Sequence, residues 1–206
     1  MKDDSKQFQK IKGILEEGGI FAYPTETVYG LGADPFQKSA VEKVMGIKGR
    51  PLHQSPLILV PDLDWVAQLT KNISPLAKRL METFWPGPLT IVFEASGKLP
   101  FWLIRNDETV ALRLSSHPWV RAFLACYQKP IISTSANVSG QQSAYTIQTV
   151  KNYFPSGVSY YVDGGVLKPS RSSTIISLSD QTIHLIRQGD ISLEKLQEFS
   201  SAPSHG

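Results

Sequence analysis

Two short polar motifs have the residue types of an anion-binding site. The first is "KGRP" at residues 48–51, in which one glycine separates Lys48 from Arg50. In an extended chain residues i and i+2 share a face, so both cations would point the same way, which is unfavourable without an anion between them. Lysine and arginine are the usual pair for phosphate oxygens. A solvated basic turn would have the same sequence, so this motif alone leaves both interpretations open.

The second motif is "STSANVSG" at residues 133–140, which follows the apolar "PII". We expect a strand to deliver Ser133, Ser135 and Asn137 to a loop that contains Gly140. Small side chains let a ligand approach the backbone, and such loops at strand ends bind nucleotides and phosphates. An ordinary turn rich in Asn, Ser and Gly is the alternative.

Two arginines in predicted strands raise a related question. Arg113 lies inside the β-branched segment "TVALRLS", where a charge should have a partner. It could bind a substrate carboxylate or pair with a protein acid, and the sequence does not decide between them. Arg187 in "LIRQGD" poses the same choice, with an exposed arginine at a strand end as the simpler alternative.

The elements that position these residues follow from hydrophobic periodicity. Apolar residues at helical spacing predict helices over residues 6–17 and 38–47, and Asp62 and Ser74 are plausible N-caps of two more. The other predicted elements are strands at "IFAYP", "PLILV", "LTIVFEA", "TVALRLS", "PIISTS", "SYYVDGG", "STIISLS" and "TIHLIRQG", and helices over 117–127, 146–154 and after Ser192. Because βα units alternate with consecutive strands, we predict an α/β fold with a mixed sheet flanked by helices, not a doubly wound Rossmann fold. We expect one domain over residues 1–206, with a frayed tail at 200–206.

Composition bounds the class of protein. The 206 residues are 41% hydrophobic and 19% charged, enough for a core, and no run approaches the ~18 apolar residues of a membrane span. We therefore expect a cytoplasmic protein without a signal peptide or membrane partner. The net charge is only +3, but residues 43–61 and 109–162 contain basic residues and no acid. If these stretches meet in space, they form an electropositive cleft; chance clustering on a solvated face is the alternative.

Several kinds of chemistry lack their residues. Cys126 is the only cysteine, and its apolar setting "WVRAFLACY" predicts a buried structural thiol. The four histidines are scattered, so we expect no zinc site, and there is no Walker A, GxGxxG or GxSxG pattern. Nothing in the sequence supports a covalent nucleophile or a dedicated protein metal site.

Taken in order, the motifs resemble one family. The segments "GGIFAYPTETVYGLGADPF", "KGRPLHQSPLILV", "FWPGPLTIVF", "VALRLSSHP", "IISTSANVSG", "SSTII" and "LIRQGDI" are similar to those of the YrdC-like threonylcarbamoyl-adenylate synthases, over about residues 8–192. The resemblance implies a YrdC/RibB-like, twisted open mixed sheet with a concave, positively charged face. It implies a nucleotidyltransferase that converts L-threonine, bicarbonate and ATP, with Mg2+ entering on the ATP, into threonylcarbamoyl-AMP and pyrophosphate. A separate tRNA threonylcarbamoyl-transferase complex would then modify tRNA.

The resemblance also implies roles for single residues. The family's K-x-R and S-x-N residues fall on Lys48, Arg50, Ser135 and Asn137, which would carry the catalytic step. The remaining implied contacts are Thr27, Arg113, Ser133 and Ser173 for threonine, and Arg50, Ser55, Thr109, Ser135, Ser143 and Arg187 for the nucleotide. In "AYPTETVYGLGADPF", we expect Thr27 to contact the amino acid, Thr25 and Glu26 to hold the loop's shape, and the glycines to let the backbone pass close to the ligand.

The chain departs from the family pattern at three places. Ser55 replaces an asparagine, Val60 replaces a histidine, and "RLSS" replaces the usual R-x-P, a change that we expect to move Arg113 slightly. Valine cannot form the histidine's hydrogen bond, so that contact with threonine is lost or supplied elsewhere. We expect a short, single-domain member of the family, in which any lid over the site is internal or absent.

Two other functions remain open at this point. A basic concave face could bind double-stranded RNA or tRNA without adenylation, because shape and phosphate contacts suffice for duplex RNA. A related carbamoyl-adenylating domain that uses carbamoyl phosphate is the other, although such domains usually lie within much longer chains.

Overall fold

The computed structural model describes residues 4–51, 56–180 and 182–201. The helices are α1 (Asp4–Glu16), α2 (Lys38–Ile47), α3 (Leu63–Leu69), α4 (Pro75–Phe84), α5 (Pro118–Tyr127), α6 (Ile147–Tyr153) and α7 (Leu193–Ser201), with a short 3-10 helix η1 (Phe101–Leu103). The strands are β1 (Phe21–Tyr23), β2 (Gly30–Ala33), β3 (Leu57–Leu59), β4 (Leu89–Glu94), β5 (Thr109–Arg113), β6 (Ile131–Ser135), β7 (Tyr160–Tyr161), β8 (Thr174–Ser179) and β9 (Thr182–Arg187). The helices and strands predicted from periodicity are thus present at the expected places.

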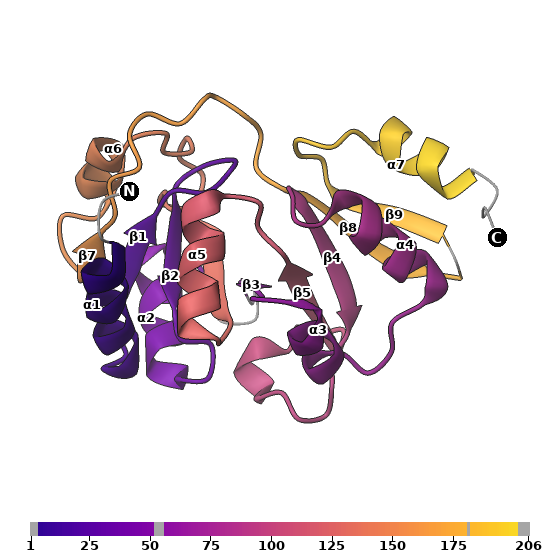
Figure 1. Ribbon diagram of the computed structural model, residues 1–206, viewed down its shortest axis with the longest axis horizontal. Coiled ribbons are helices and arrows are strands. Elements are labelled where there is room, and N and C mark those ends of the chain that lie inside the picture. Colours follow the sequence, from indigo (N-terminus) through magenta and orange to yellow (C-terminus); the bar gives the residue numbers. More distant parts are fainter. Residues whose placement is uncertain (1–3, 52–55, 181, 202–206) are drawn as a thin grey trace.

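The described strands form one mixed sheet in the order β7-β1-β2-β6-β3-β5-β4-β8-β9. The parallel pairs are β1 with β7, β3 with β5 and β4 with β8, and the antiparallel pairs are β1 with β2, β2 with β6, β3 with β6, β4 with β5 and β8 with β9. Figure 1 shows the sheet crossing the molecule from β7 and β1 on the left to β8 and β9 on the right. The predicted mixed sheet flanked by helices is confirmed.

Apolar clusters cover the sheet on both faces. Helices α1 and α5 pack on one face, against Phe21 and Tyr23 of β1. Residues of α2, α3, α4, α6 and α7 belong to the cluster on the other face, which includes Ala22 of the same strand. Successive residues of a strand point to opposite faces, so β1 contributes to both clusters.

The local signals for helix starts are confirmed. The carboxylate of Asp62 accepts a hydrogen bond from the backbone N–H of Trp65 at 3.1 Å, and the hydroxyl of Ser74 accepts one from Ala77 at 3.1 Å. Both side chains satisfy a backbone donor that the first turn of a helix leaves free. At the other end of the chain, the tail expected to fray begins inside α7, and residues 202–206 lie outside the described residues.

Strand β2 was not expected from the sequence, because two of its four residues are glycines. The structure gives a packing reason for Gly32: a Cβ there would lie 2.6 Å from the ring of Phe21 and 2.9 Å from that of Tyr23. Gly32 therefore serves the contact between β2 and these aromatic rings. The expectation that this glycine brings the backbone close to a ligand is wrong, whereas Gly30 does line the cavity described below.

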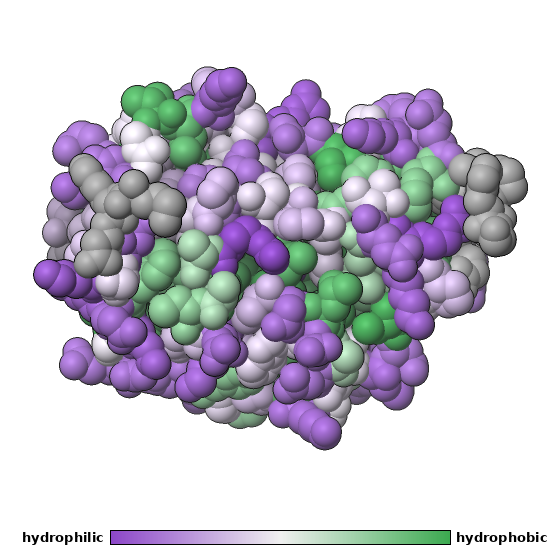
Figure 2. Space-filling model, viewed as in Figure 1, coloured by the Kyte–Doolittle hydropathy of each residue, from purple (hydrophilic) through white to green (hydrophobic). Residues whose placement is uncertain are grey.

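Cys126 is exposed, so the expectation of a buried thiol is wrong. Helix α5 buries Val120, Phe123, Leu124 and Tyr127, which recur at helical spacing on one face. Cys126 lies off that face, and Figure 2 shows pale green, moderately apolar residues over the position that α5 has in Figure 1. The apolar residues next to Cys126 in the sequence did not indicate which face of α5 packs against the sheet.

Candidate active site

A cavity of about 570 Å³ opens over the middle of the sheet. Its walls come from the ends of β2, β3, β5, β6, β8 and β9 and from the loops beside them. On β6, Ile131 belongs to the apolar cluster of α1 and α5, and Ser133 and Ser135 follow at intervals of two. Because alternate residues share a face, the cavity lies on the α1/α5 face of the sheet, beyond the part that these helices cover.

The structure brings most of the predicted site residues to this cavity. The lining includes Thr27, Arg50, Arg113, Ser133, Ser135, Ser173 and Arg187. The predicted residues that are described but do not line it are Lys48, Thr109, Asn137 and Ser143. Ser55 lies outside the described residues.

Three arginines from distant parts of the chain converge on the cavity. Arg50 follows α2, Arg113 ends β5 and Arg187 ends β9, and all three line the same space. Burial lowers the pKa of Arg187, and the charges of Arg113 and Arg50 lower it further. The buried Nε atom of Arg50 has no hydrogen-bond partner among the described residues. Like charges held this close favour an anionic ligand between them.

The acid-free stretches of the sequence do meet here, but only in part. Arg50 comes from the first stretch and Arg113 from the second. Other basic residues of these stretches lie elsewhere; for example, the ammonium of Lys43 donates to the carbonyl of Gly18 at 3.1 Å. The predicted electropositive cleft therefore exists, but it is built from few of the residues that suggested it.

Arg113 has a protein partner and also faces the cavity. Its Nη2 lies 2.6 Å from Oε1 of Glu26, and the hydroxyl of Ser115 donates to Oε2 of Glu26 at 2.6 Å. Burial acts to raise the pKa of Glu26, but the charge of Arg113 and the hydrogen bond from Ser115 outweigh it, so the pKa lies below its ordinary value. Glu26 is thus ionised at neutral pH. Of the two alternatives that the sequence left open for Arg113, the protein acid is therefore confirmed, and a contact with a substrate carboxylate stays a prediction for a residue that lines the cavity.

Arg187 also has a partner at the cavity wall. Its Nη2 donates to the carbonyl of Ser173 at 2.8 Å and to the hydroxyl of Ser173 at 3.2 Å. The Ser173 hydroxyl in turn lies 2.9 Å from that of Thr90. Arg187 is thus exposed at the end of its strand, as the simpler alternative expects, but its guanidinium group also lines the cavity and has a protein partner there.

Ser133 is oriented by a buried tyrosine. The hydroxyl of Tyr23 donates to the Ser133 hydroxyl at 2.7 Å. Burial raises the pKa of Tyr23, the largest effect on that group, so the phenol stays protonated and remains the donor. Ser133 can then donate its own proton to an acceptor in the cavity.

Lys48 and Arg50 do not lie side by side in an extended chain, so that expectation is wrong. Lys48 is the C-cap of α2 in a helical conformation (φ −86°, ψ −10°), and Gly49 has a φ of +64°. The fully buried ammonium of Lys48 donates to the carbonyls of Ser135 and, at 2.7 Å, of Asn137. Burial, together with the charge of Arg50, lowers the pKa of Lys48 to about 7. Lys48 braces the loop after β6 from behind, while Arg50 faces the cavity.

Asn137 has a similar structural position. Its Nδ2 donates to the carbonyls of Val138 at 3.0 Å and Gln141 at 2.7 Å. Its buried Oδ1 has no hydrogen-bond partner among the described residues. Asn137 therefore folds the loop on itself and retains one unused acceptor.

Comparison with known proteins agrees with this architecture. The family model Sua5_yciO_yrdC, described as "Telomere recombination", matches residues 13–189. The chain belongs to the Sua5/YciO/YrdC family. The threonylcarbamoyl-AMP synthase of Vibrio vulnificus strain YJ016 is 36% identical over 183 residues, which are 88% of this chain and 97% of that protein.

Longer members of the family are also similar. The threonylcarbamoyl-AMP synthase of Pyrococcus abyssi is 34% identical, over 90% of this chain but only 55% of that protein. The crystal structure of P. abyssi Sua5 complexed with L-threonine superposes with a TM-score of 0.89 at 32% identity, covering 94% of this chain and 57% of that one. The chain thus spans just over half the length of the Pyrococcus protein.

The loop that contains Thr27 is held by its own hydroxyls. Oγ1 of Thr25 donates to the carbonyl of Val28 at 2.6 Å, and the Val28 N–H lies 3.2 Å from the same oxygen. The Thr27 hydroxyl, 3.1 Å from that of Thr25, lies at the cavity wall. The expectation that Thr25 holds the loop's shape is confirmed; the role of Glu26 extends beyond the loop, to Arg113.

The family histidine is not replaced by a polar residue at its own position. Val60 is fully buried in the apolar cluster opposite α1 and α5, and it does not line the cavity. Its backbone N–H donates to the carbonyl of Arg113 at 3.0 Å. Val60 thus supports the strand that carries Arg113.

Sequence reasoning missed one wall of the cavity. Arg105, Asn106 and Asp107 line it from the turn between η1 and β5. The Thr109 hydroxyl donates to Oδ1 of Asp107 at 2.5 Å, so Thr109 supports this wall from outside the lining. The polar "RND" between two apolar segments was the available signal, but a solvated turn has the same composition.

Among the described residues, no group of three or more His, Cys, Asp or Glu side chains is arranged to hold a metal ion. Within the same residues, none of the helices combines the length and the hydropathy needed to cross a bilayer.

Proposed function

We propose that this protein is a threonylcarbamoyl-AMP synthase, a nucleotidyltransferase that makes threonylcarbamoyl-AMP and pyrophosphate from L-threonine, bicarbonate and ATP. The observation that carries the proposal is the convergence of Arg50, Arg113 and Arg187 on one cavity whose wall also provides several serine and threonine hydroxyl groups. Membership of a family with threonylcarbamoyl-AMP synthases in it supports the same conclusion.

The reaction suits a site without a nucleophilic side chain. The amine of threonine attacks CO2 derived from bicarbonate and becomes a carbamate, with loss of a proton. A carbamate oxygen then attacks the α-phosphorus of ATP, and pyrophosphate leaves. The protein must hold two anions together and stabilise the added charge of the transition state, for which fixed guanidinium groups are suited.

The residues divide into an amino-acid side and a nucleotide side. Arg113 would bind the threonine carboxylate, with Thr27, Ser133 and Ser173 as hydroxyl partners. On the nucleotide side we place Arg50, Arg187 and Ser135. The resemblance also implies nucleotide contacts from Thr109 and Ser143, which do not line the cavity, and from Ser55, which lies outside the described residues. Lys48 and Asn137, which do not line the cavity, would act by holding the loop that carries Ser135.

Magnesium would enter as part of the substrate, MgATP, and would neutralise part of the charge on its phosphates. Asp107 is the acidic side chain among the described lining residues, and arginines predominate around it. This donor set fits a metal delivered by the nucleotide better than one held by the protein alone.

The product would serve the threonylcarbamoyladenosine modification of tRNA. The threonylcarbamoyl group of the product is a mixed anhydride with AMP, activated for transfer. We propose that a separate tRNA threonylcarbamoyl-transferase complex consumes it. Because ATP, threonine and tRNA are present in the cytoplasm, we place the reaction there.

The proposal is tested by pyrophosphate release. The purified protein, MgATP and bicarbonate should release pyrophosphate only when L-threonine is added, and mass spectrometry should detect threonylcarbamoyl-AMP. Pyrophosphate release that does not depend on threonine would refute the proposal. An RNA-binding module would instead show RNA affinity that falls steeply with salt and no turnover.

L-Serine provides a specificity control. It lacks one methyl group, and a pocket discriminates against such a loss by only about 1–3 kcal/mol, or roughly 10- to 200-fold. We therefore expect slow but measurable use of serine.

A further inference from the structure

The side chain of Glu26 reaches the candidate site only through Arg113. Arg113 lines the cavity, whereas Glu26 does not. The two side chains are 5% and 14% exposed, and they meet at 2.6 Å. Resting on the function proposed above, we propose that Glu26 is a positioning residue that fixes Arg113 for the carboxylate of L-threonine, and that Ser115 fixes Glu26.

The carboxylate of Glu26 accepts hydrogen bonds from two groups other than Arg113. Its Oε2 accepts a hydrogen bond from the Ser115 hydroxyl at 2.6 Å, and its Oε1 accepts one from the backbone N–H of Ser116 at 3.3 Å. Both donors lie immediately after Arg113 on the same segment, so the segment that provides the arginine also locks the arginine's partner. An ion pair anchored at one end by two hydrogen bonds keeps its geometry without a ligand.

The guanidinium of Arg113 keeps a donor available. Its buried Nε has no hydrogen-bond partner in the described part of the chain. Nη2 is occupied by the ion pair with Glu26 at 2.6 Å. A buried guanidinium with an unused donor at a cavity wall is arranged for a further anion. Glu26 therefore compensates the charge of Arg113 without using all of its donors.

Electrostatics make this compensation necessary. Arg113 lies near Arg50 and Arg187, whose charges repel it, and an unrestrained guanidinium would turn away from them. The charge of Glu26 lies behind Arg113 and opposes that movement. Threonine then binds to an arginine that is already ordered, which avoids the affinity lost in ordering a long side chain.

The opposite possibility is that Glu26 competes with threonine for Arg113. Competition would require the carboxylate of Glu26 to move away when the ligand arrives. Its two hydrogen bonds to the segment after Arg113, and its position outside the cavity lining, oppose such a movement. The two ideas predict opposite effects when the charge of Glu26 is removed.

The test is Glu26→Gln, which removes the charge and keeps the shape. L-Threonine binding is measured by calorimetry without ATP, and the KM values for threonine and MgATP by pyrophosphate release. We expect the Kd and KM for threonine to rise about tenfold, the affinity cost of ordering one arginine on binding. The KM for MgATP should stay within about twofold.

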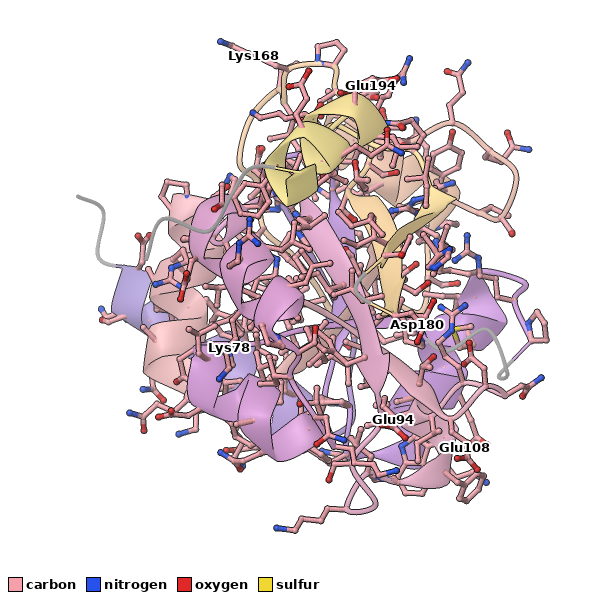
Figure 3. The ribbon with its side chains drawn as sticks, turned by 90° about the vertical axis from the view of Figure 1, so that its right-hand side faces the viewer. Lys78, Glu94, Glu108, Lys168, Asp180 and Glu194 are labelled. Carbon is pink, nitrogen blue, oxygen red and sulfur yellow. The ribbon has the colours of Figure 1, made fainter. Side chains whose placement is uncertain are left out.

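Glu94→Gln is the matched control. Glu94 lies at the end of β4, beside Glu108 in Figure 3, and forms an exposed ion pair with Lys71 at 2.8 Å. The same chemical change there breaks a pair of similar length whose two residues do not belong to the cavity lining. Threonine binding should be unchanged in this variant.

Ser115→Ala is a second, milder variant. It removes one anchor of Glu26 and should weaken threonine binding by roughly two- to fivefold, again without an effect on MgATP. If circular dichroism shows that Glu26→Gln does not fold, Ser115→Ala provides the test. An unchanged Kd for threonine in Ser115→Ala then overturns the proposal.

The remaining outcomes are distinct. A Kd for threonine in Glu26→Gln that is unchanged or tighter overturns the positioning role. A lower melting temperature with an unchanged Kd in the folded protein would assign Glu26 to stability alone and also overturns it. If the wild-type protein itself binds no threonine and releases no pyrophosphate, it is the proposed synthase function that fails.

Discussion

Replacement of Lys48 by methionine should change the pH dependence of stability. Burial lowers the pKa of Lys48 from about 10.5 to about 7. Between these values the unfolded chain holds one more proton than the folded protein at this residue, so stability rises with pH. Below pH 7 Lys48 is protonated in both the folded and the unfolded protein, so it no longer makes the free energy of unfolding depend on pH. Lys48→Met removes the titration but keeps much of the side chain's volume.

The magnitude follows from the two pKa values. One proton changes the free energy of unfolding by at most about 1.4 kcal/mol per pH unit, and by half of that near pH 7, where the folded protein is half protonated. Between pH 7 and 9, the free energy of unfolding of the wild type should therefore rise by about 2 kcal/mol more than that of Lys48→Met. The variant also leaves two buried carbonyls without their donor, at about 1–3 kcal/mol each. This second cost does not change with pH. Lys48→Met should thus be less stable at pH 9 by a wider margin than at pH 7.

The assay is urea denaturation at pH 6, 7, 8 and 9, followed by the fluorescence of the tryptophans, of which there are four. Lys71→Met is the control, because Glu94 raises the pKa of this exposed lysine and it does not titrate in this range. The difference in the free energy of unfolding between Lys71→Met and the wild type should be constant over pH 7–9. A constant difference for Lys48→Met as well, within about 0.5 kcal/mol, would refute the reasoning that the buried lysine loses its proton near neutrality.

Three further predictions follow from the cavity and its surroundings. Arg50→Ala should lower the rate of threonine-dependent pyrophosphate release on the order of 100-fold, because it removes a charge from the transition state; unchanged turnover would exclude Arg50 from the mechanism. Gly32→Ala should lower the free energy of unfolding by about 1–3 kcal/mol in urea denaturation, because its Cβ would lie 2.6 Å from the ring of Phe21; equal stability would contradict this close packing. The exposed thiol of Cys126 should react with a disulfide reagent in the folded protein, and labelling that requires denaturant would show that the α5 surface is covered.

Local structure was largely predictable from the sequence. The helix starts at Asp62 and Ser74 depend on a side chain and backbone donors three residues away, which are contacts that the sequence specifies directly. The strands at "LTIVFEA" and "PIISTS" have β-branched residues that fit a buried sheet. Strand β2 was missed because its glycines have no strand preference of their own and are explained only by the aromatic rings opposite.

The candidate site was predictable in its residues but less so in their directions. The ordered motifs selected Arg50, Arg113 and Arg187, and all three line the cavity. The same motifs placed Lys48 beside Arg50, although Lys48 points into the protein and binds backbone carbonyls. The direction in which the Lys48 side chain points depends on how α2 ends and on where the loop after β6 lies. A four-residue motif specifies neither of these.

What the sequence alone determined is therefore the set of elements and the chemical types gathered for the reaction, since both rest on preferences that act within a few residues. Tertiary structure decided which of these types meet. Glu26 reaches Arg113 from a different segment, and Cys126 is exposed because packing selected the other face of its helix. Contacts of this kind depend on the pairing of distant strands and on which surfaces bury together, so no local pattern specifies them.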